Sequence, residues 1–137
     1  MYKKTITYKD FNGTERTEDF YFHLKQSTLA RMELLEEKGL VEYLEDIVKA
    51  MDRKKLIATF DDIIRKSYGV KSDDGRRFIQ NDQVYEEFTE TEAYSKFFME
   101  LITDDEEAAR FINGIMPELP QDHNGSEKNV NGENSSL

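Results

Sequence analysis

Hydrophobic and polar residues alternate over the first 24 positions in a way that predicts two β-strands joined by a tight turn. Side chains alternate between the two faces of extended backbone, so Tyr2, Ile6 and Tyr8 fall on one face of the first strand. The second strand has its own apolar set: Phe20, Phe22 and Leu24. Because two strands are only marginally stable in water, we expect this hairpin to pack on other elements.

The length of the turn decides whether the two apolar sets share a face. A two-residue turn puts them on opposite faces, and that register is disfavoured because one face must be buried. A three-residue loop over 11–13, with its glycine in the left-handed conformation, brings the two sets onto one face. The same register places Lys9 opposite Glu15 and Thr7 opposite Thr17, which are favourable cross-strand pairs.

From Gln26 onwards the spacing of apolar residues changes to three and four, which is typical of amphipathic helices. This spacing predicts three helices, the first ending at Gly39 and the third at Gly69. A short helix and two longer ones follow, with capping boxes predicted at Thr89–Glu92 and Thr103–Glu106. The expected fold class is α+β, an N-terminal β-hairpin packed on a mainly α-helical domain of about six helices.

The composition changes after Pro117. Residues 118–137 are rich in Asn, Gly, Ser and Glu and contain few apolar side chains, so burial cannot repay the entropy of ordering them. Four acidic residues and one lysine give this segment a net charge of −3. We expect one domain over 1–117, with the hairpin in 2–24 and the helices in 26–116, followed by a disordered, flexible polar tail over 118–137.

Charge and composition exclude several classes of function. The net charge of −10 and the pI near 4.7 disfavour binding to a nucleic-acid backbone, which needs a concentrated basic surface. The chain has no cysteine, so a disulfide scaffold and a thiolate metal site are excluded. No apolar run is long enough to span a membrane, and no apolar stretch of a signal peptide follows the N-terminus. We therefore expect a cytoplasmic protein with no nucleic-acid or membrane partner.

Residues with catalytic or metal-binding chemistry are sparse. There is no GxSxG, GxxxxGK or GxGxxG pattern, and the two histidines are not expected to converge. The acidic run Asp104–Glu107 is open to two interpretations, a divalent-cation site or the favourable placement of negative charge in the first turn of a helix. We favour the second interpretation. The sequence accordingly predicts no enzyme, no metal site and no cofactor.

The stretch Tyr68–Phe78 concentrates acids, bases and glycines that helix packing does not require. One explanation is a charge-balanced turn in which Asp73 or Asp74 caps the following segment and an arginine pairs with an acid. The other is a rigid polar epitope that recognises another protein through bidentate arginine contacts. The candidate protein-binding residues of this stretch are Lys71, Asp73, Asp74, Arg76, Arg77 and Phe78.

Two adjacent aromatic residues, Phe97 and Phe98, add a second candidate. Neighbouring residues on a helix cannot both point at the same centre, so one of them can flank the core or face outwards. Core packing is the favoured role for the pair, and a partner-binding groove is the alternative. Both are kept as candidate protein-binding residues.

Four segments carry a resemblance to a known family: Asp19–Phe22, Lys66–Phe78, Thr91–Tyr94 and Phe111–Ile115. They resemble segments of tail assembly chaperones from long-tailed (siphovirus-type) phages and prophages of Gram-positive bacteria, over about residues 2–117. The resemblance implies a non-enzymatic protein of the host bacterial cytoplasm that takes part in tail assembly and is absent from the mature virion. Its implied partners are the tape measure protein and the tail tube (major tail) protein.

A tape measure protein is long and helical, so many copies of a chaperone are needed along it. We therefore expect weak individual contacts, avidity and self-association into a homo-oligomer. The competing interpretation is an acidic phage-encoded inhibitor or DNA mimic that binds a host protein. That class needs acids gathered on one continuous face, whereas here they alternate with lysines and arginines.

Overall fold

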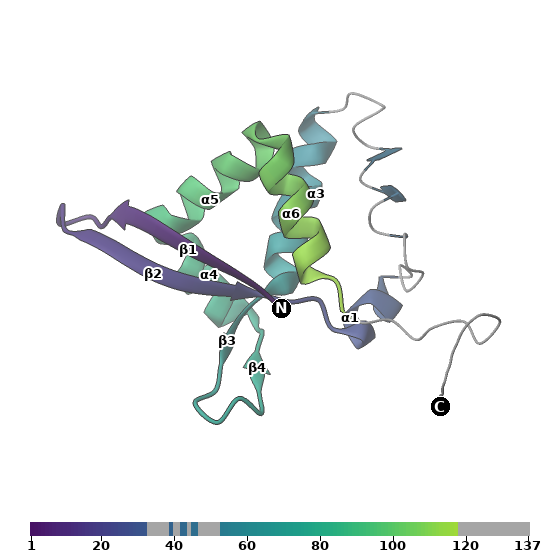
Figure 1. The fold of residues 1–137 in the computed structure, drawn as a ribbon, viewed down its shortest axis with the longest axis horizontal. Coiled ribbons are helices and arrows are strands. Elements are labelled where there is room, and N and C mark those ends of the chain that lie inside the picture. The colour runs from purple at the N-terminus through teal and green to yellow at the C-terminus, as the bar shows by residue number, and fades with distance from the viewer. Residues whose placement is uncertain (33–38, 40–41, 44, 47–52, 118–137) are drawn as a thin grey trace.

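The computed structural model describes residues 1–32, 39, 42–43, 45–46 and 53–117. A long β-hairpin lies beside a group of helices, and a second, shorter hairpin projects away from it (Figure 1). This arrangement confirms the predicted α+β class. The described elements are β1 Tyr2–Lys9, β2 Glu15–Phe22, α1 Gln26–Arg31, α3 Arg53–Ser67, β3 Tyr68–Lys71, β4 Phe78–Ile79, α4 Asp82–Thr89, α5 Glu92–Thr103 and α6 Asp105–Ile115.

The β1–β2 hairpin has the register that its hydrophobic pattern predicts. Lys9 pairs with Glu15 and Thr7 with Thr17, and the hydroxyl oxygens of the two threonines lie 2.9 Å apart. The loop glycine has a φ of 83°, the left-handed conformation expected of it. The strand pattern therefore predicted both the turn length and the buried face.

The predicted helices are partly corrected by the structure. The first helix ends at Arg31 and not at Gly39. The second predicted helix, over 41–51, lies largely outside the described residues. The third ends at Ser67, so Tyr68 belongs to a strand and not to that helix.

The stretch that was interpreted as a loop after the third helix is a hairpin, β3–β4. It extends the first hairpin into one four-stranded sheet of order β1-β2-β3-β4. Gly69 lies within β3, where the absence of a side chain matters for packing. A Cβ at Gly69 would lie 2.7 Å from the ring of Phe78 and 2.8 Å from Cγ of Gln80. Gly69 therefore allows β4 to lie close against β3 and does not end a helix.

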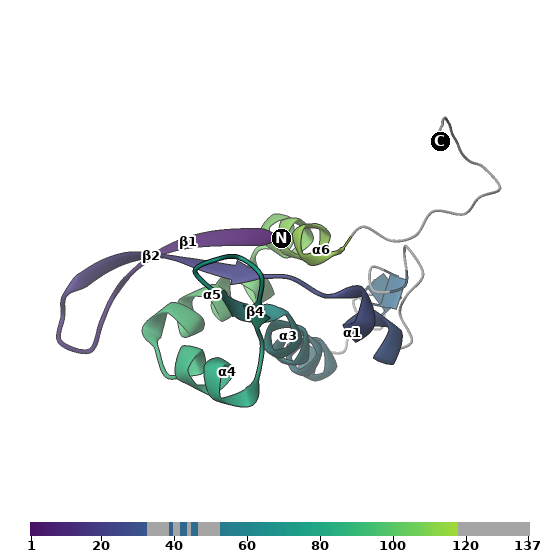
Figure 2. The same ribbon diagram turned by 90° about the horizontal axis from the view of Figure 1, so that it is seen from below.

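The core lies between the buried face of the first hairpin and the helices. In Figure 2 the hairpin forms one layer, and α3, α4 and α5 lie beneath it. Phe22, at the end of β2, is fully buried at the centre of this core. Its ring centroid lies 5.0 Å from that of Phe97 on α5 and 5.5 Å from that of Phe111 on α6. One side chain thus connects the sheet to two helices.

The starts of the last two helices differ slightly from the predicted capping boxes. Thr91, not Thr89, caps α5, and its hydroxyl accepts a hydrogen bond from the backbone N–H of Tyr94. Asp104, not Thr103, caps α6 and accepts from two backbone N–H groups of the first turn. The acidic run therefore begins a helix, where negative charge meets the positive end of the helix dipole.

One acidic residue of that first turn, Glu107, is buried and ties α6 to β1. Its carboxylate accepts hydrogen bonds from the hydroxyl of Tyr2 and, at 3.1 Å, from Nζ of Lys4. Arg110 donates to the other oxygen at 2.8 Å.

The ring of Tyr2 also leaves no space at Gly114, where an added Cβ would lie 2.5 Å from Cδ1 of that ring. The glycine of the segment Phe111–Ile115 thus permits the docking of β1 on α6.

Candidate protein-binding surface

The turn between β3 and β4 is held by its own hydrogen bonds. The backbone N–H of Ser72 donates to the carbonyl of Arg77 at 2.9 Å, and Gly75 occupies the left-handed region with a φ of 75°. One oxygen of Asp74 accepts from the hydroxyl of Ser72 at 2.8 Å and from the backbone N–H of Arg76 at 3.0 Å. These bonds, the one from Arg76 first, lower the pKa of Asp74. Asp74 thus fixes the turn, as the structural explanation for this stretch required, but the arginine–acid pair that it also required is not found for Arg76 or Arg77 among the described residues.

The other charged side chains of the turn point into solvent. Asp73, Arg76 and Arg77 are exposed, and no ion pair joins either arginine to another described residue. Lys71 is also exposed, and its Nζ lies 4.3 Å from the ring centroid of Tyr21, a cation–π contact across the two hairpins. The turn therefore presents charged groups on a backbone that is already ordered.

A groove opens between the two hairpins beside this turn. Strands β2 and β3 pair at Tyr21–Gly69 and Phe22–Tyr68 and then diverge, as Figure 1 shows. The outer edge of β2 from Glu15 to Asp19 therefore has no partner strand among the described residues. The groove has a volume of about 320 Å³ and is lined by Asp19, Phe20, Tyr21, Tyr68, Gly69, Val70, Lys71, Ser72 and Asp73.

The lining of the groove includes two aromatic rings that pack on the core and one exposed apolar side chain. The ring of Tyr68 stacks on Phe88 at 4.2 Å, and the ring of Phe20 lies 5.1 Å from the same residue, so both are braced by the core. Val70 stands at the wall of the groove with 44% of its surface exposed. An apolar side chain and unpaired strand backbone next to charged groups suit the binding of a polypeptide.

The aromatic candidates have different positions. Phe78 is half-buried on the second hairpin, where its ring lies against Gly69. Phe97 is fully buried in the core, so a partner cannot reach it without unfolding this part of the protein. Phe98 is half-buried on α5 and stacks on Tyr94 at 5.9 Å. The structure brings the charged candidates and Phe78 together on one hairpin and leaves the α5 pair apart from them.

Sequence reasoning missed the contribution of β2 to this surface. Tyr21 lies on the face of the strand opposite to the core set, and an aromatic residue on an otherwise polar strand face is a signal that was available. Val70 was not distinguished because it lies among charged residues. Both side chains line the groove once β2 and β3 are neighbours.

Other kinds of site find no support in the part of the chain that the structure describes. No group of three or more histidine or acidic residues is placed there to hold a metal ion. Burial lowers the pKa of His23, and its Nδ1 is buried without a hydrogen bond. In the described residues no helix combines the length and the apolar composition that crossing a bilayer needs.

A small α+β domain with an ordered charged turn and an adjacent polypeptide-sized groove has the features of a protein-binding module. A family model described as phage tail assembly chaperone matches residues 1–135. No curated protein and no solved structure matches the chain. The chain therefore belongs to the phage tail assembly chaperone family, whose members are in general non-enzymatic. The match runs beyond Pro117, so it includes most of the tail that the resemblance over 2–117 left out.

Proposed function

We propose that this protein binds the tape measure protein of its phage in the host bacterial cytoplasm, keeps it soluble and helps to recruit tail tube subunits. It acts without catalysis and is absent from the mature virion. The observation that carries the proposal is the groove between β2 and β3 beside an ordered, charged turn in a member of the tail assembly chaperone family.

The groove accounts for how one small domain binds a long client without a deep pocket. Where the backbone of the client is extended and not helical, it can hydrogen-bond to the edge of β2 that has no partner strand among the described residues, while one of its apolar side chains contacts Val70 and the rings of Phe20 and Tyr68. Backbone hydrogen bonds do not depend on the client's sequence, so different extended segments of a tape measure protein can fit the same edge. Each contact is weak, and several copies along one client supply avidity.

The turn supplies the charged part of the same surface. Arg76 and Arg77 have no internal carboxylate partner among the described residues, so their guanidinium groups are available to carboxylates of the client. Asp74 holds the turn in place before binding. Little conformational entropy is then lost at the backbone when a client binds.

Co-expression with the tape measure protein tests the proposal as a whole. We expect the tape measure protein to appear in the soluble fraction and to co-elute with this protein in size-exclusion chromatography. Expression of the tape measure protein alone should leave it in the insoluble fraction. Equal insolubility with and without this protein contradicts the proposed function.

The double substitution Arg76→Ala with Arg77→Ala tests the turn. We expect the affinity for the tape measure protein to fall about tenfold or more, or ~1.4 kcal/mol, because two guanidinium groups are removed from the contact. Titration calorimetry or a pull-down assay measures the affinity. Thermal unfolding should be unchanged, since neither side chain forms an ion pair with another described residue.

The matched control is Arg53→Ala with Lys54→Ala, which removes the same charge from exposed positions at the start of α3. It should bind the tape measure protein as well as the wild type does. If the two double variants bind equally, the turn is not part of the surface. If the variant of the turn unfolds, the arginines have a structural role.

A further inference from the structure

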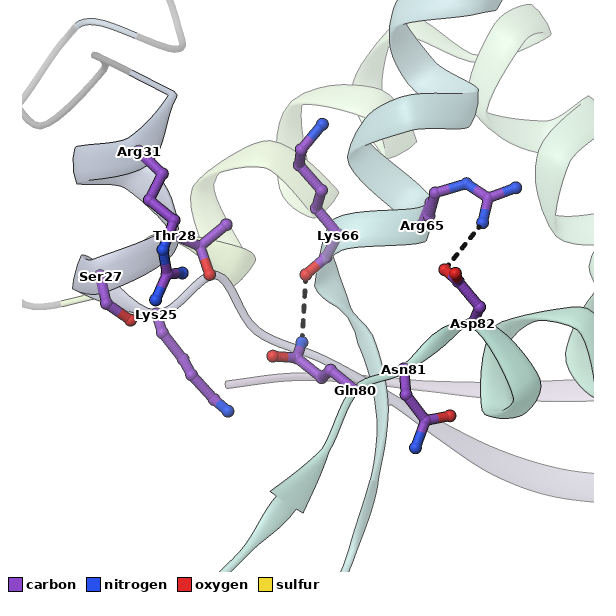
Figure 3. A pocket seen from close by; sticks show the side chains of 9 residues that line it. All are labelled: Lys25, Ser27, Thr28, Arg31, Arg65, Lys66, Gln80, Asn81 and Asp82. Atoms are coloured by element: carbon purple, nitrogen blue, oxygen red, sulfur yellow. Dashed lines mark hydrogen bonds and ion pairs between the residues drawn. The ribbon is translucent and has the colours of Figure 1, made fainter.

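A second concave surface, which we call the basic pocket, lies on the far side of β4 from the groove. It is formed where α1, the end of α3 and the link from β4 to α4 meet (Figure 3). Its volume is about 360 Å³, and its lining residues are Lys25, Ser27, Thr28, Arg31, Arg65, Lys66, Gln80, Asn81 and Asp82. Four of these side chains are cationic, in a protein whose net charge is −10.

The charges of the basic pocket are only partly compensated from within. Arg65 pairs with Asp82 at 3.4 Å, as drawn in Figure 3, and Lys66 pairs with Asp62. Nζ of Lys25 donates at 3.3 Å to a backbone carbonyl, which carries no full charge. Neither Lys25 nor Arg31 has a carboxylate partner among the described residues. Within the described residues, two positive charges on the α1 side of the pocket are therefore without a carboxylate partner.

The opposite wall of the basic pocket is held in place by one amide. Nε2 of Gln80 donates to the carbonyl oxygens of His23, Lys66 and Ser67 at distances of 3.0–3.1 Å. These bonds join the end of β2, the end of α3 and the link between β4 and α4 around the pocket. The cationic side chains thus extend from a backbone frame that already has its shape.

The end of α6 lies beside this pocket. The backbone N–H of Leu24 donates to the carbonyl of Ile115 at 2.8 Å, so α6 ends next to the residue that precedes Lys25. In Figure 1 the end of α6 runs towards α1. The segment 118–137 follows within three residues of Ile115 and has a net charge of −3. Its first acidic residues, Glu118 and Asp122, are close in sequence to that point; five extended residues span up to about 17 Å.

We propose that the basic pocket is a binding site for acidic polypeptide and that its occupant in the free protein is this chain's own segment 118–137. Opposite charge, the start of the segment beside Lys25 and a family match that continues to residue 135 support this assignment. Because the segment is tethered, its effective concentration at the pocket is high, and a contact that is weak by itself is sufficient. An acidic segment of a tail protein then has to displace it.

Paramagnetic relaxation in the full chain tests the proposal, and the absence of cysteine makes the labelling specific. A nitroxide is attached after Ser126→Cys, and amide signals of the isotope-labelled protein are compared before and after reduction of the label. We expect signals of Ser27, Thr28 and Asn81 to lose intensity at low salt and to regain it at high salt, because salt screens exposed charges. Uniformly weak loss over the surface overturns the proposal.

Charge variants distinguish binding of the segment at the pocket from a general electrostatic attraction between the segment and the protein surface. Lys25→Gln with Arg31→Gln should abolish the local loss of intensity, whereas Arg53→Gln with Lys54→Gln, the same charge change at the other end of α3, should leave it intact. Glu118→Gln with Asp122→Asn should also abolish the local loss of intensity without changing any residue of the pocket, which covers the case in which the pocket variant fails to fold. Persistence of the loss in both pocket and tail variants overturns the proposal.

A mixed sample identifies the copy to which the segment binds. Spin-labelled chains without isotope are added to isotope-labelled chains without a spin label, so any intensity loss reports binding between molecules. We expect none beyond the effect of free nitroxide. Loss at Ser27 and Asn81 in the mixed sample alone would assign the segment to the pocket of another copy and overturn the intramolecular assignment. Failure of the tape measure co-expression would leave all these outcomes unaffected.

Discussion

Replacement of Phe22 by alanine is expected to lower the free energy of unfolding by about 4 kcal/mol, the range of buried Phe→Ala changes being about 3–5 kcal/mol. Phe22 is fully buried and surrounded by other aromatic rings. Its ring centroid lies 5.0–6.0 Å from those of Phe97, Phe111 and Phe88. Its removal opens a cavity where the sheet meets α4, α5 and α6. Since small domains are stable by about 5–15 kcal/mol, a large part of the stability is lost. Urea denaturation followed by circular dichroism measures the change.

Phe11 provides the matched control for this prediction. It stands in the turn of the same hairpin with 77% of its surface exposed. Phe11→Ala makes the same chemical change where no cavity can form, so its effect should stay within about 0.5 kcal/mol. If Phe22→Ala costs no more than the control, packing of Phe22 does not hold the sheet against the helices.

The hairpin could be predicted from sequence because its information is local. Each strand has apolar residues at every second position, and the loop between the strands contains a glycine. Only one register then buries both apolar sets, and Lys9 pairs with Glu15 as that register requires. The amphipathic helices follow from the same kind of pattern. The starts of α5 and α6 were predicted within two residues, because neighbouring residues such as Thr103 and Asp104 are both capable of capping.

The second hairpin was missed because its pairing partner is distant in sequence. Tyr68 pairs with Phe22 and Gly69 with Tyr21, across more than forty residues that include α1 and α3. Four residues of β3 carry too short a pattern to indicate a strand without that partner. A glycine after a helix was therefore interpreted as its end, although its role is to accommodate Phe78.

Only those parts of the candidate surface that have a local sequence signal were predicted. The charged residues of the turn stand out in any local window, and the structure places them together on one hairpin. The groove arises from the divergence of β2 and β3 and has no local signature. The choice between Phe97 and Phe98 depends on the rotation of α5 about its axis, which the packing against Phe22 decides.

The buried carboxylate of Glu107 is the second position where a large effect is expected. Burial raises the pKa of Glu107, but hydrogen bonds from Tyr2, Arg110 and Lys4 outweigh it, and the pKa ends below its ordinary value. The pKa of Tyr2 is raised, by burial and by its bond to this carboxylate. The ionised form of Glu107 is thus the one that holds β1 against α6.

Glu107→Gln is expected to lower the free energy of unfolding by about 3 kcal/mol at neutral pH. The carboxylate accepts hydrogen bonds from Tyr2, Lys4 and Arg110, and the substitution replaces this charged acceptor with a neutral amide. The NH₂ group of the amide is itself a donor, so it faces another donor and one hydrogen bond is lost. The exposed neighbour Glu106 gives the control. Glu106→Gln should cost about 0.5 kcal/mol, the contribution of one charge in the first turn of a helix.

The pH dependence distinguishes this role from simple packing. A lowered pKa in the folded state means that the unfolded chain binds more protons, so the stabilisation is complete above the ordinary glutamate pKa of 4.5 and is lost as pH falls towards the folded value. Denaturation curves of wild type and Glu107→Gln should therefore differ most above pH 4.5 and converge in acid. Asp10 and Asp74 also have lowered pKa values, but both proteins contain them, so the difference between the curves isolates Glu107. A difference that stays constant down to acidic pH would mean that the shape of the side chain stabilises the contact and that its charge does not.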